Sequence, residues 1–172
     1  MEFFIAQGIS VVNGILAVIM MQFKSMKKIL TFQIICNLLT ASSYFLLGGF
    51  SGAGICIIAI IQSVVMFIYN IKKINPHRIV IFAFIALYIG CSAFYYNSLI
   101  DICSALAAVC FAMSIVQTKA SMSRLWYLFN PLCWLIYDIF TKAYGNLVLH
   151  LAVFISTLFG IIRNDILQKI KQ

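Results

Sequence analysis

The chain has 172 residues, of which 64% are hydrophobic and 9% charged, with a mean hydropathy of +1.07 and a formal net charge of +8. A soluble domain is about half apolar and about one quarter charged, so this composition excludes a water-soluble globular protein. A nucleic-acid-binding protein needs a continuous basic face, whereas the bases here lie between apolar segments. No nucleic-acid partner is therefore expected.

Seven apolar segments follow one another along the chain, separated by short polar or glycine-containing breaks. A bilayer span needs about 20 mainly apolar residues, and a spanning backbone must satisfy its own hydrogen bonds, so each segment is predicted to be a transmembrane helix. The expected spans are 3–23, 29–47, 53–71, 79–96, 99–117, 125–142 and 145–163. The chain is thus predicted to be an all-α membrane protein that lies almost wholly in the lipid bilayer.

The basic residues predict the orientation of these spans, because short cytoplasmic loops are enriched in Lys and Arg. Of the twelve bases, only Lys142 falls on one side of the predicted membrane. The others lie in the first, third and fifth loops or in the tail: Lys24, Lys27, Lys28, Lys72, Lys73, Arg78, Lys119, Arg124, Arg163, Lys169 and Lys171. This asymmetry requires an odd number of spans, with the N-terminus outside and the C-terminus in the cytoplasm.

A weak internal repeat relates the two halves of the chain. When residues 37–71 are laid on 130–164, a constant shift of 93, the identical pairs include polar and turn residues. These pairs are Asn37 with Asn130, Tyr44 with Tyr137, Gly52 with Gly145, and Ser63 with Ser156. The repeat predicts a 3+1+3 arrangement of two parallel three-helix bundles, since a single linker helix restores the starting direction. The predicted units are a first bundle at 1–71, a linker helix with flanking loops at 72–98, and a second bundle with a short cytoplasmic tail at 99–172.

Several polar side chains fall inside the predicted spans, where an unpaired amide or hydroxyl group is costly. Such groups either line a wet cavity, where an asparagine suits a neutral polar solute, or join helices through a hydrogen bond. The residues predicted to line a central, substrate-binding cavity are Asn13, Asn37, Gln62, Asn130 and Ser156.

Three further positions are candidates for coupling or movement. Asp138 lies well inside a span and one turn before Lys142, so it forms either a structural ion pair or a proton-coupling carboxylate. His150 is a weaker candidate for a functional group. Pro131 directly follows Asn130 and removes a helical hydrogen bond, which predicts a kink that could serve gating.

Catalysis has no support in the sequence. No nucleophile elbow, metal-spaced histidine pair or paired carboxylates are present, so no enzyme activity is expected. The six cysteines lie in apolar runs without metal-type spacing and are interpreted as packing residues, so neither a metal nor a cofactor is expected.

Several motifs resemble a known family. The segment Leu125 to Gly145 reads LWYLFNPLCWLIYDIFTKAYG and precedes a span that ends in FGIIRND, while Ala6-Gln7-Gly8 and Leu46-Leu47-Gly48 belong to the first two spans. Over nearly the whole chain, these motifs resemble the bacterial inner-membrane YgjV-type family. That family is regarded as distantly similar to the PQ-loop and SWEET proteins. The resemblance implies a small-solute carrier fold with alternating access, located in the bacterial inner (plasma) membrane.

The SWEET likeness does not extend to the substrate site. In SWEET-like carriers an asparagine from the last helix of each bundle lines the central site, whereas here the corresponding spans offer Gln62, Ser63 and Ser156. The Pro-Gln signature is also absent, so the resemblance does not imply a sugar substrate.

Two hypotheses of function follow. The first is a carrier or facilitator for a small polar solute, which is released as the two bundles rock. The second is a non-transporting scaffold or sensor, in which small residues of the fifth span pack against a partner protein. These residues are Ala105, Ala107, Ala108 and Ala112. Self-association into a homo-oligomer stays open in both cases.

Overall fold

The computed structural model describes residues 2–46, 50–94, 101–141 and 144–166. Over these ranges the chain forms seven α-helices and a final π-helical turn, without a strand. They are α1 (Glu2–Met20), α2 (Met26–Leu46), α3 (Phe50–Lys72), α4 (Arg78–Phe94), α5 (Asp101–Val116), α6 (Ala120–Thr141), α7 (Tyr144–Ile161) and η1 (Ile162–Ile166). The predicted all-α fold is therefore confirmed.

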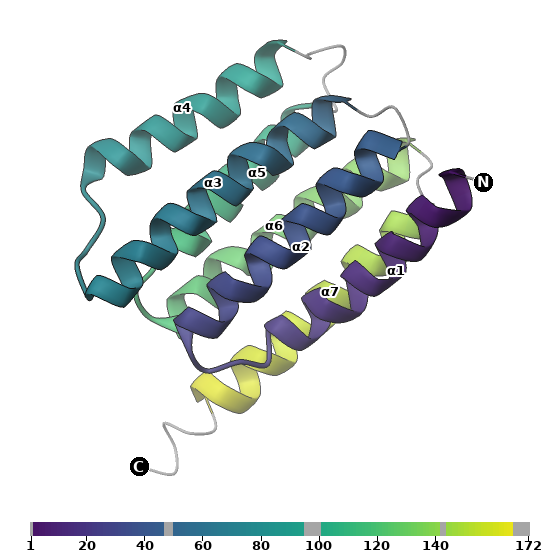
Figure 1. The fold of residues 1–172 in the computed structure, drawn as a ribbon. Coiled ribbons are helices and arrows are strands. Elements are labelled where there is room, and N and C mark those ends of the chain that lie inside the picture. The colour runs from purple at the N-terminus through teal and green to yellow at the C-terminus, as the bar shows by residue number, and fades with distance from the viewer. Residues whose placement is uncertain (1, 47–49, 95–100, 142–143, 167–172) are drawn as a thin grey trace.

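Six of the helices form two layers that lie face to face (Figure 1). In the first layer α2 packs between α1 and α3, and in the second α6 packs between α5 and α7. Across the layers α1 contacts α7, α3 contacts α5, and α2 contacts α6. If a two-fold axis parallel to the helices exchanges the layers, α1 takes the place of α5 and α3 takes the place of α7. The contact between α1 and α7 then becomes the contact between α5 and α3, as two parallel repeats require.

The remaining helix, α4, lies at the edge of the two layers and connects them. It packs only against α3 and α5 among the pairs with substantial contact (Figure 1). The helices thus follow the 3+1+3 arrangement. The boundaries of the predicted units at 71 and 98 remain a prediction.

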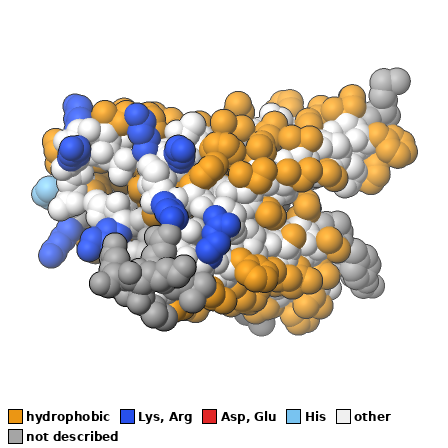
Figure 2. Space-filling view, turned by 90° about the horizontal axis from the view of Figure 1, so that it is seen from below, with side chains coloured by type: hydrophobic (Ala, Val, Ile, Leu, Met, Phe, Trp, Pro, Cys, Tyr) orange, Lys and Arg blue, Asp and Glu red, His pale blue; other side chains and the backbone are white. Residues whose placement is uncertain are grey.

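Large apolar side chains cover the outer surface of the layers. Phe4, Phe82, Phe140, Val148 and Phe159 are each more than 60% exposed, and Figure 2 shows such side chains along the flank of the molecule. An apolar surface of this extent is stable against lipid rather than water. Three stretches, Phe3–Met20, Ala53–Lys72 and Leu147–Ile166, are long and apolar enough to cross a membrane by length and composition.

The two middle helices are more polar than their neighbours although they are long enough to span. α2 has 21 residues and α6 has 22, and at about 1.5 Å per residue each exceeds a hydrocarbon core of about 30 Å. Each is flanked by two helices of its own layer and faces the other layer. Polar side chains on the inner faces of these helices, such as Gln33, Ser43 and Asn130, therefore lie inside the protein, where they can be paired, instead of in lipid.

One end of the layers carries the basic loops. We call this end the basic face, and its exposed bases gather together in Figure 2. They are Lys24, Lys27, Lys28, Lys72, Lys73, Arg78, Lys119 and Arg163. At this end Lys73 closes α3 in the left-handed region, with a φ of 54°, and the Ile74 amide donates to the Tyr69 carbonyl at 3.1 Å. This face is the predicted cytoplasmic side.

Two helices begin three to five residues before their predicted spans at the basic face, which is a correction. α2 begins at Met26 and α6 at Ala120, so Lys27, Lys28 and Arg124 are helical. The hydropathy pattern ended each span at the first charge, but a lysine in the first helical turn extends its ammonium to the interface while its backbone stays helical. Arg124 differs from the lysines because its side chain is buried, with 2% exposed.

Candidate functional site

A cavity of about 240 Å³ lies between the two layers. At about 30 Å³ per molecule of liquid water, it has room for about eight waters. All seven helices contribute to its wall, from Gln7 on α1 to Val153 on α7. Since the exposed Gln7 belongs to the wall, the cavity extends toward the end opposite the basic face.

The first layer supplies most of the polar wall. Asn13 on α1 donates from Nδ2 to Oγ1 of Thr40 on α2 at 2.8 Å, and the hydroxyls of Ser10 and Ser43 lie 3.0 Å apart. All four line the cavity, as does Asn37. These bonds between neighbouring helices hold α1 against α2 and fix where the remaining polar atoms point.

The second layer supplies Asn130 and several rings. Asn130 on α6 donates from Nδ2 to the Ala107 carbonyl of α5 at 2.8 Å. Tyr127 lines the wall one turn away. The Trp134 and His150 rings stack with centroids 5.7 Å apart and 12° between planes. Asn130 therefore serves both as a lining residue and as a link between helices.

Four buried polar atoms in this wall lack a hydrogen-bond partner. They are Asn13 Oδ1, Gln33 Oε1, Asn37 Nδ2 and the Tyr88 hydroxyl. Gln33 is 4% exposed and Tyr88 is fully buried. Leaving one such group unpaired costs about 1–3 kcal/mol, so the wall favours contents that can both donate and accept.

Two predicted lining residues lie outside this wall, which corrects the prediction. Ser156 donates to the Val18 carbonyl at 2.7 Å and accepts from Gln22 Nε2 at 2.9 Å. Gln62 is fully buried, and neither of its amide atoms has a partner. Each lies about one turn closer to the basic face than the last lining residue of its helix, Val153 or Ala59. Depth estimated from span ends carries an error of about one turn, which is enough to move a side chain below the cavity.

The remaining candidates are only partly described. The side chain of Asp138 and all of Lys142 lie outside the described residues, so their pairing stays a prediction. Pro131 lies inside α6 and is buried beside Asn130. The chain remains helical through it, so the hinge role also stays a prediction.

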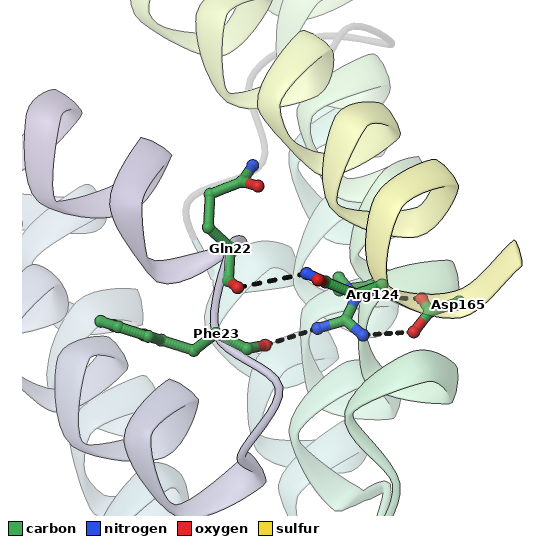
Figure 3. A network of polar contacts seen from close by, with 5 residues as sticks. Gln22, Phe23, Arg124 and Asp165 are labelled. Atoms are coloured by element: carbon green, nitrogen blue, oxygen red, sulfur yellow. Dashed lines mark hydrogen bonds and ion pairs between the residues drawn. The ribbon is translucent and has the colours of Figure 1, made fainter. Parts of the chain in front are cut away.

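A second polar cluster lies where α1, α6 and α7 meet at the basic face (Figure 3). Arg124 forms a bidentate ion pair with Asp165, in which Nε lies 3.0 Å from Oδ2, and it donates from Nη1 to the Phe23 carbonyl at 2.5 Å. Asn164 donates from Nδ2 to the Gln22 carbonyl at 3.1 Å. Arg124 is 2% exposed and Asp165 14%, so this pair is largely shielded from water.

Sequence reasoning missed several of these residues. Gln33, Tyr88 and Tyr127 face the cavity, but their helices are apolar on several sides and hydropathy does not show which face turns inward. Arg124 was counted among the loop bases. The signal that could have found it is Asp165, an acid among the bases of the C-terminal segment.

Residues 4–168 match the family Imp-YgjV, described as bacterial inner membrane protein. The chain belongs to this family. No curated protein and no solved structure matches it. Membership in the Imp-YgjV family agrees with the apolar outer surface and assigns the chain to the bacterial inner membrane.

The small residues of α5 offer this Imp-YgjV protein little surface for a partner helix. Ala107 and Ala112 are fully buried, and Ala108 is 4% exposed. They pack within the chain, and Ala108 lines the cavity. For these three residues the structure favours packing within the chain, and a partner protein stays a prediction.

Proposed function

We propose that this protein is a carrier or facilitator for a small, uncharged polar solute that binds in the cavity between the layers. The observation that carries the proposal is a wall with unpartnered buried donors and acceptors between two parallel layers. Buried polar atoms are usually paired in a protein interior, so four of them without a partner around one cavity favour a polar occupant.

The described part of the wall holds no fixed charge to neutralise an ion, which favours an uncharged solute. Among the described residues that line the cavity, none is Lys, Arg, Asp or Glu. Moving an unpaired ion into such surroundings costs several kcal/mol, whereas a neutral molecule needs only hydrogen bonds. Asn13, Gln33, Asn37 and Tyr88 supply these bonds.

Movement of the solute would follow from the two layers tilting against each other. Two parallel layers related by an axis along the membrane normal are an arrangement used by transporters. The predicted orientation places the basic face in the cytoplasm, so the cavity described here would take solute from outside.

The first experiment is a binding screen on purified protein in detergent. Neutral polyols, monosaccharides and small amides are compared with anionic and cationic solutes of similar size by the shift in thermal unfolding temperature. A solute at ten times its Kd stabilises the folded state by about 1.4 kcal/mol. Neutral compounds that stabilise are then tested for uptake into proteoliposomes.

Matched variants separate the cavity from general effects on the fold. Asn37→Leu and Asn130→Leu are expected to lose binding and uptake while still reaching the membrane as folded protein. Thr31→Val is the control on α2, because Thr31 is exposed and donates only to the Lys27 carbonyl of its own helix. Normal uptake in both cavity variants, or stabilisation by charged solutes alone, would contradict the proposal.

A further inference from the structure

The cavity is closed toward the basic face by a continuous layer of buried side chains. In each of the six layered helices, side chains that are 2% exposed or less lie about one turn closer to this face than the nearest residue that lines the cavity. These side chains are Met20 and Met21 on α1, Ile29 and Leu30 on α2, Gln62 and Ser63 on α3, Ser114 and Ile115 on α5, Ser123 and Arg124 on α6, and Thr157 on α7. Solute in the cavity therefore has no passage to the basic face in this conformation.

Polar contacts reinforce this closure on one side, where the end of α1 meets α6 and α7. Gln22 donates from Nε2 to the carbonyl and hydroxyl of Ser156 at 2.8 and 2.9 Å. In return, the carbonyls of Gln22 and Phe23 accept from Asn164 and Arg124 (Figure 3). These two carbonyls belong to the turn that follows α1, and a buried carbonyl needs a partner, so the bonds hold this turn only while the layers touch.

The close approach of the two backbones depends on Gly160. A Cβ at this position would lie 2.5 Å from the Met21 carbonyl oxygen and 3.2 Å from Cδ of Arg124. The first distance is to backbone, which cannot rotate away as a side chain can. Any larger residue at position 160 must therefore move the end of α1 away from α7.

At the opposite edge of the layers, the described residues at the equivalent positions form no such contact. The shift of 93 that relates the halves places Thr31 and Lys72 at the positions of Arg124 and Asp165. Thr31 is exposed and bonds within its helix, and Lys72 is exposed. The ion pair thus belongs to one seam, between α1 and the α6–α7 pair, while α3 and α5 meet without it.

We propose that Arg124, Asp165, Asn164 and Gly160 form a latch with the end of α1, and that its release opens the cavity to the basic face. Opening would separate α1 from α6 and α7 while α3 and α5 stay in contact. The role of the latch in transport rests on the proposed function, but the opening itself can be measured without a solute.

The test uses Cys56, which lines the cavity on α3, as the only cysteine. The five other cysteines are replaced by alanine, and a membrane-impermeant methanethiosulfonate is applied to sealed vesicles from either face. A Lys24→Cys variant without Cys56 carries its cysteine at the basic face, so its reaction reports whether this face of the vesicles is exposed to the reagent. In the parent, Cys56 is expected to react from the face opposite the basic one only.

Gly160→Ala and Asp165→Asn are each expected to make Cys56 reactive from the basic face, with a rate rise of about tenfold or more as a minor open state becomes populated. Gly160→Ala adds bulk and Asp165→Asn removes a charge, so either variant that folds is enough for the test. Only a failure of both to fold would hide the change in Cys56 reactivity. In that case a spin-label distance between the ends of α1 and α7 in Asn164→Ala decides, with lengthening expected. Gly8→Ala is the matched control, since its Cβ would meet nothing within 4 Å.

Unchanged one-sided reactivity of Cys56 in folded Gly160→Ala and Asp165→Asn would overturn the latch. Equal reactivity of the parent from the basic face would overturn it too. If the variants switch sides while no neutral solute binds, the latch stands and the carrier proposal fails. If neutral solutes bind but the reactivity of Cys56 does not change in the variants, the carrier proposal stands and the latch fails.

Discussion

The ion pair between Arg124 and Asp165 should contribute a coupling energy that a double-mutant cycle can measure. The cycle compares Arg124→Gln, Asp165→Asn and the double variant with the parent. Both carboxylate oxygens of Asp165 accept from Arg124, whose Nη1 also donates to the Phe23 carbonyl. Because the guanidinium is 2% exposed, Asp165→Asn leaves a buried positive charge without a neutralising anion.

The burial of the two side chains sets the size of the effect. Removing one partner of a fully buried pair costs about 3–5 kcal/mol. Asp165 is 14% exposed and lies at the basic face, so water screens part of this cost, and we expect Asp165→Asn to lose about 2–3 kcal/mol. Arg124→Gln leaves the more exposed partner and should lose about 1–2 kcal/mol. The double variant should lose less than the sum, with a coupling of about 1–2 kcal/mol.

The free energies of unfolding are obtained by titrating SDS into protein in mixed micelles and following helix content by circular dichroism. Thr31→Val, in which no ion pair is affected, provides a baseline for a polar substitution at the same depth. A double variant that loses the full sum of the two single losses would show that the pair is uncoupled, and the geometry of Figure 3 would then not persist in solution.

Two further substitutions test the packing around the cavity. In Gly14→Ala the new Cβ would lie 2.4 Å from Cδ2 of Leu149, a flexible side-chain end. We expect the free energy of unfolding to fall by about 1–3 kcal/mol, and Leu149→Ala in the same chain to restore most of this loss. A loss that Leu149→Ala does not reduce would refute the contact. Gln62→Leu replaces a fully buried amide with no partner by an apolar group of similar size. We expect the free energy of unfolding to rise by about 1–3 kcal/mol, which is measured as a higher unfolding temperature. A lower unfolding temperature would mean that the amide has a partner.

The order, number and direction of the helices could be predicted from the sequence, because each depends on properties that a linear pattern records. Length and apolar content define a span, and the placement of lysines such as Lys24 and Lys72 defines which ends lie together. The repeat that matches Asn37 with Asn130 also led to two residues of the same wall. These inferences need no knowledge of which face of a helix turns inward.

The rotation of each helix could not be predicted, and this explains most of the residues that were missed or misplaced. In a soluble helix the polar face marks the solvent side, but in a membrane both lipid and protein interior accept apolar groups. Gln33 and Gln62 look alike in the sequence, yet one lines the cavity and the other lies below it. Pairs distant in sequence, such as Arg124 with Asp165, are likewise invisible to a pattern read along the chain.

Several residues without a counterpart in the first layer lie on α6. Along this helix Arg124 lies in the closure at the basic face, while Tyr127 and Asn130 line the cavity. Pro131, which has no backbone donor, leaves the Tyr127 carbonyl without its helical bond. The helix is therefore weakest along the part that lines the cavity, about one turn from Arg124, and Leu38 at the matching position of α2 introduces no such weakness. If α6 bends at this point, a ligand that pulls on Asn130 would shift Arg124 against the end of α1, so we predict that binding in the cavity acts on the latch through α6.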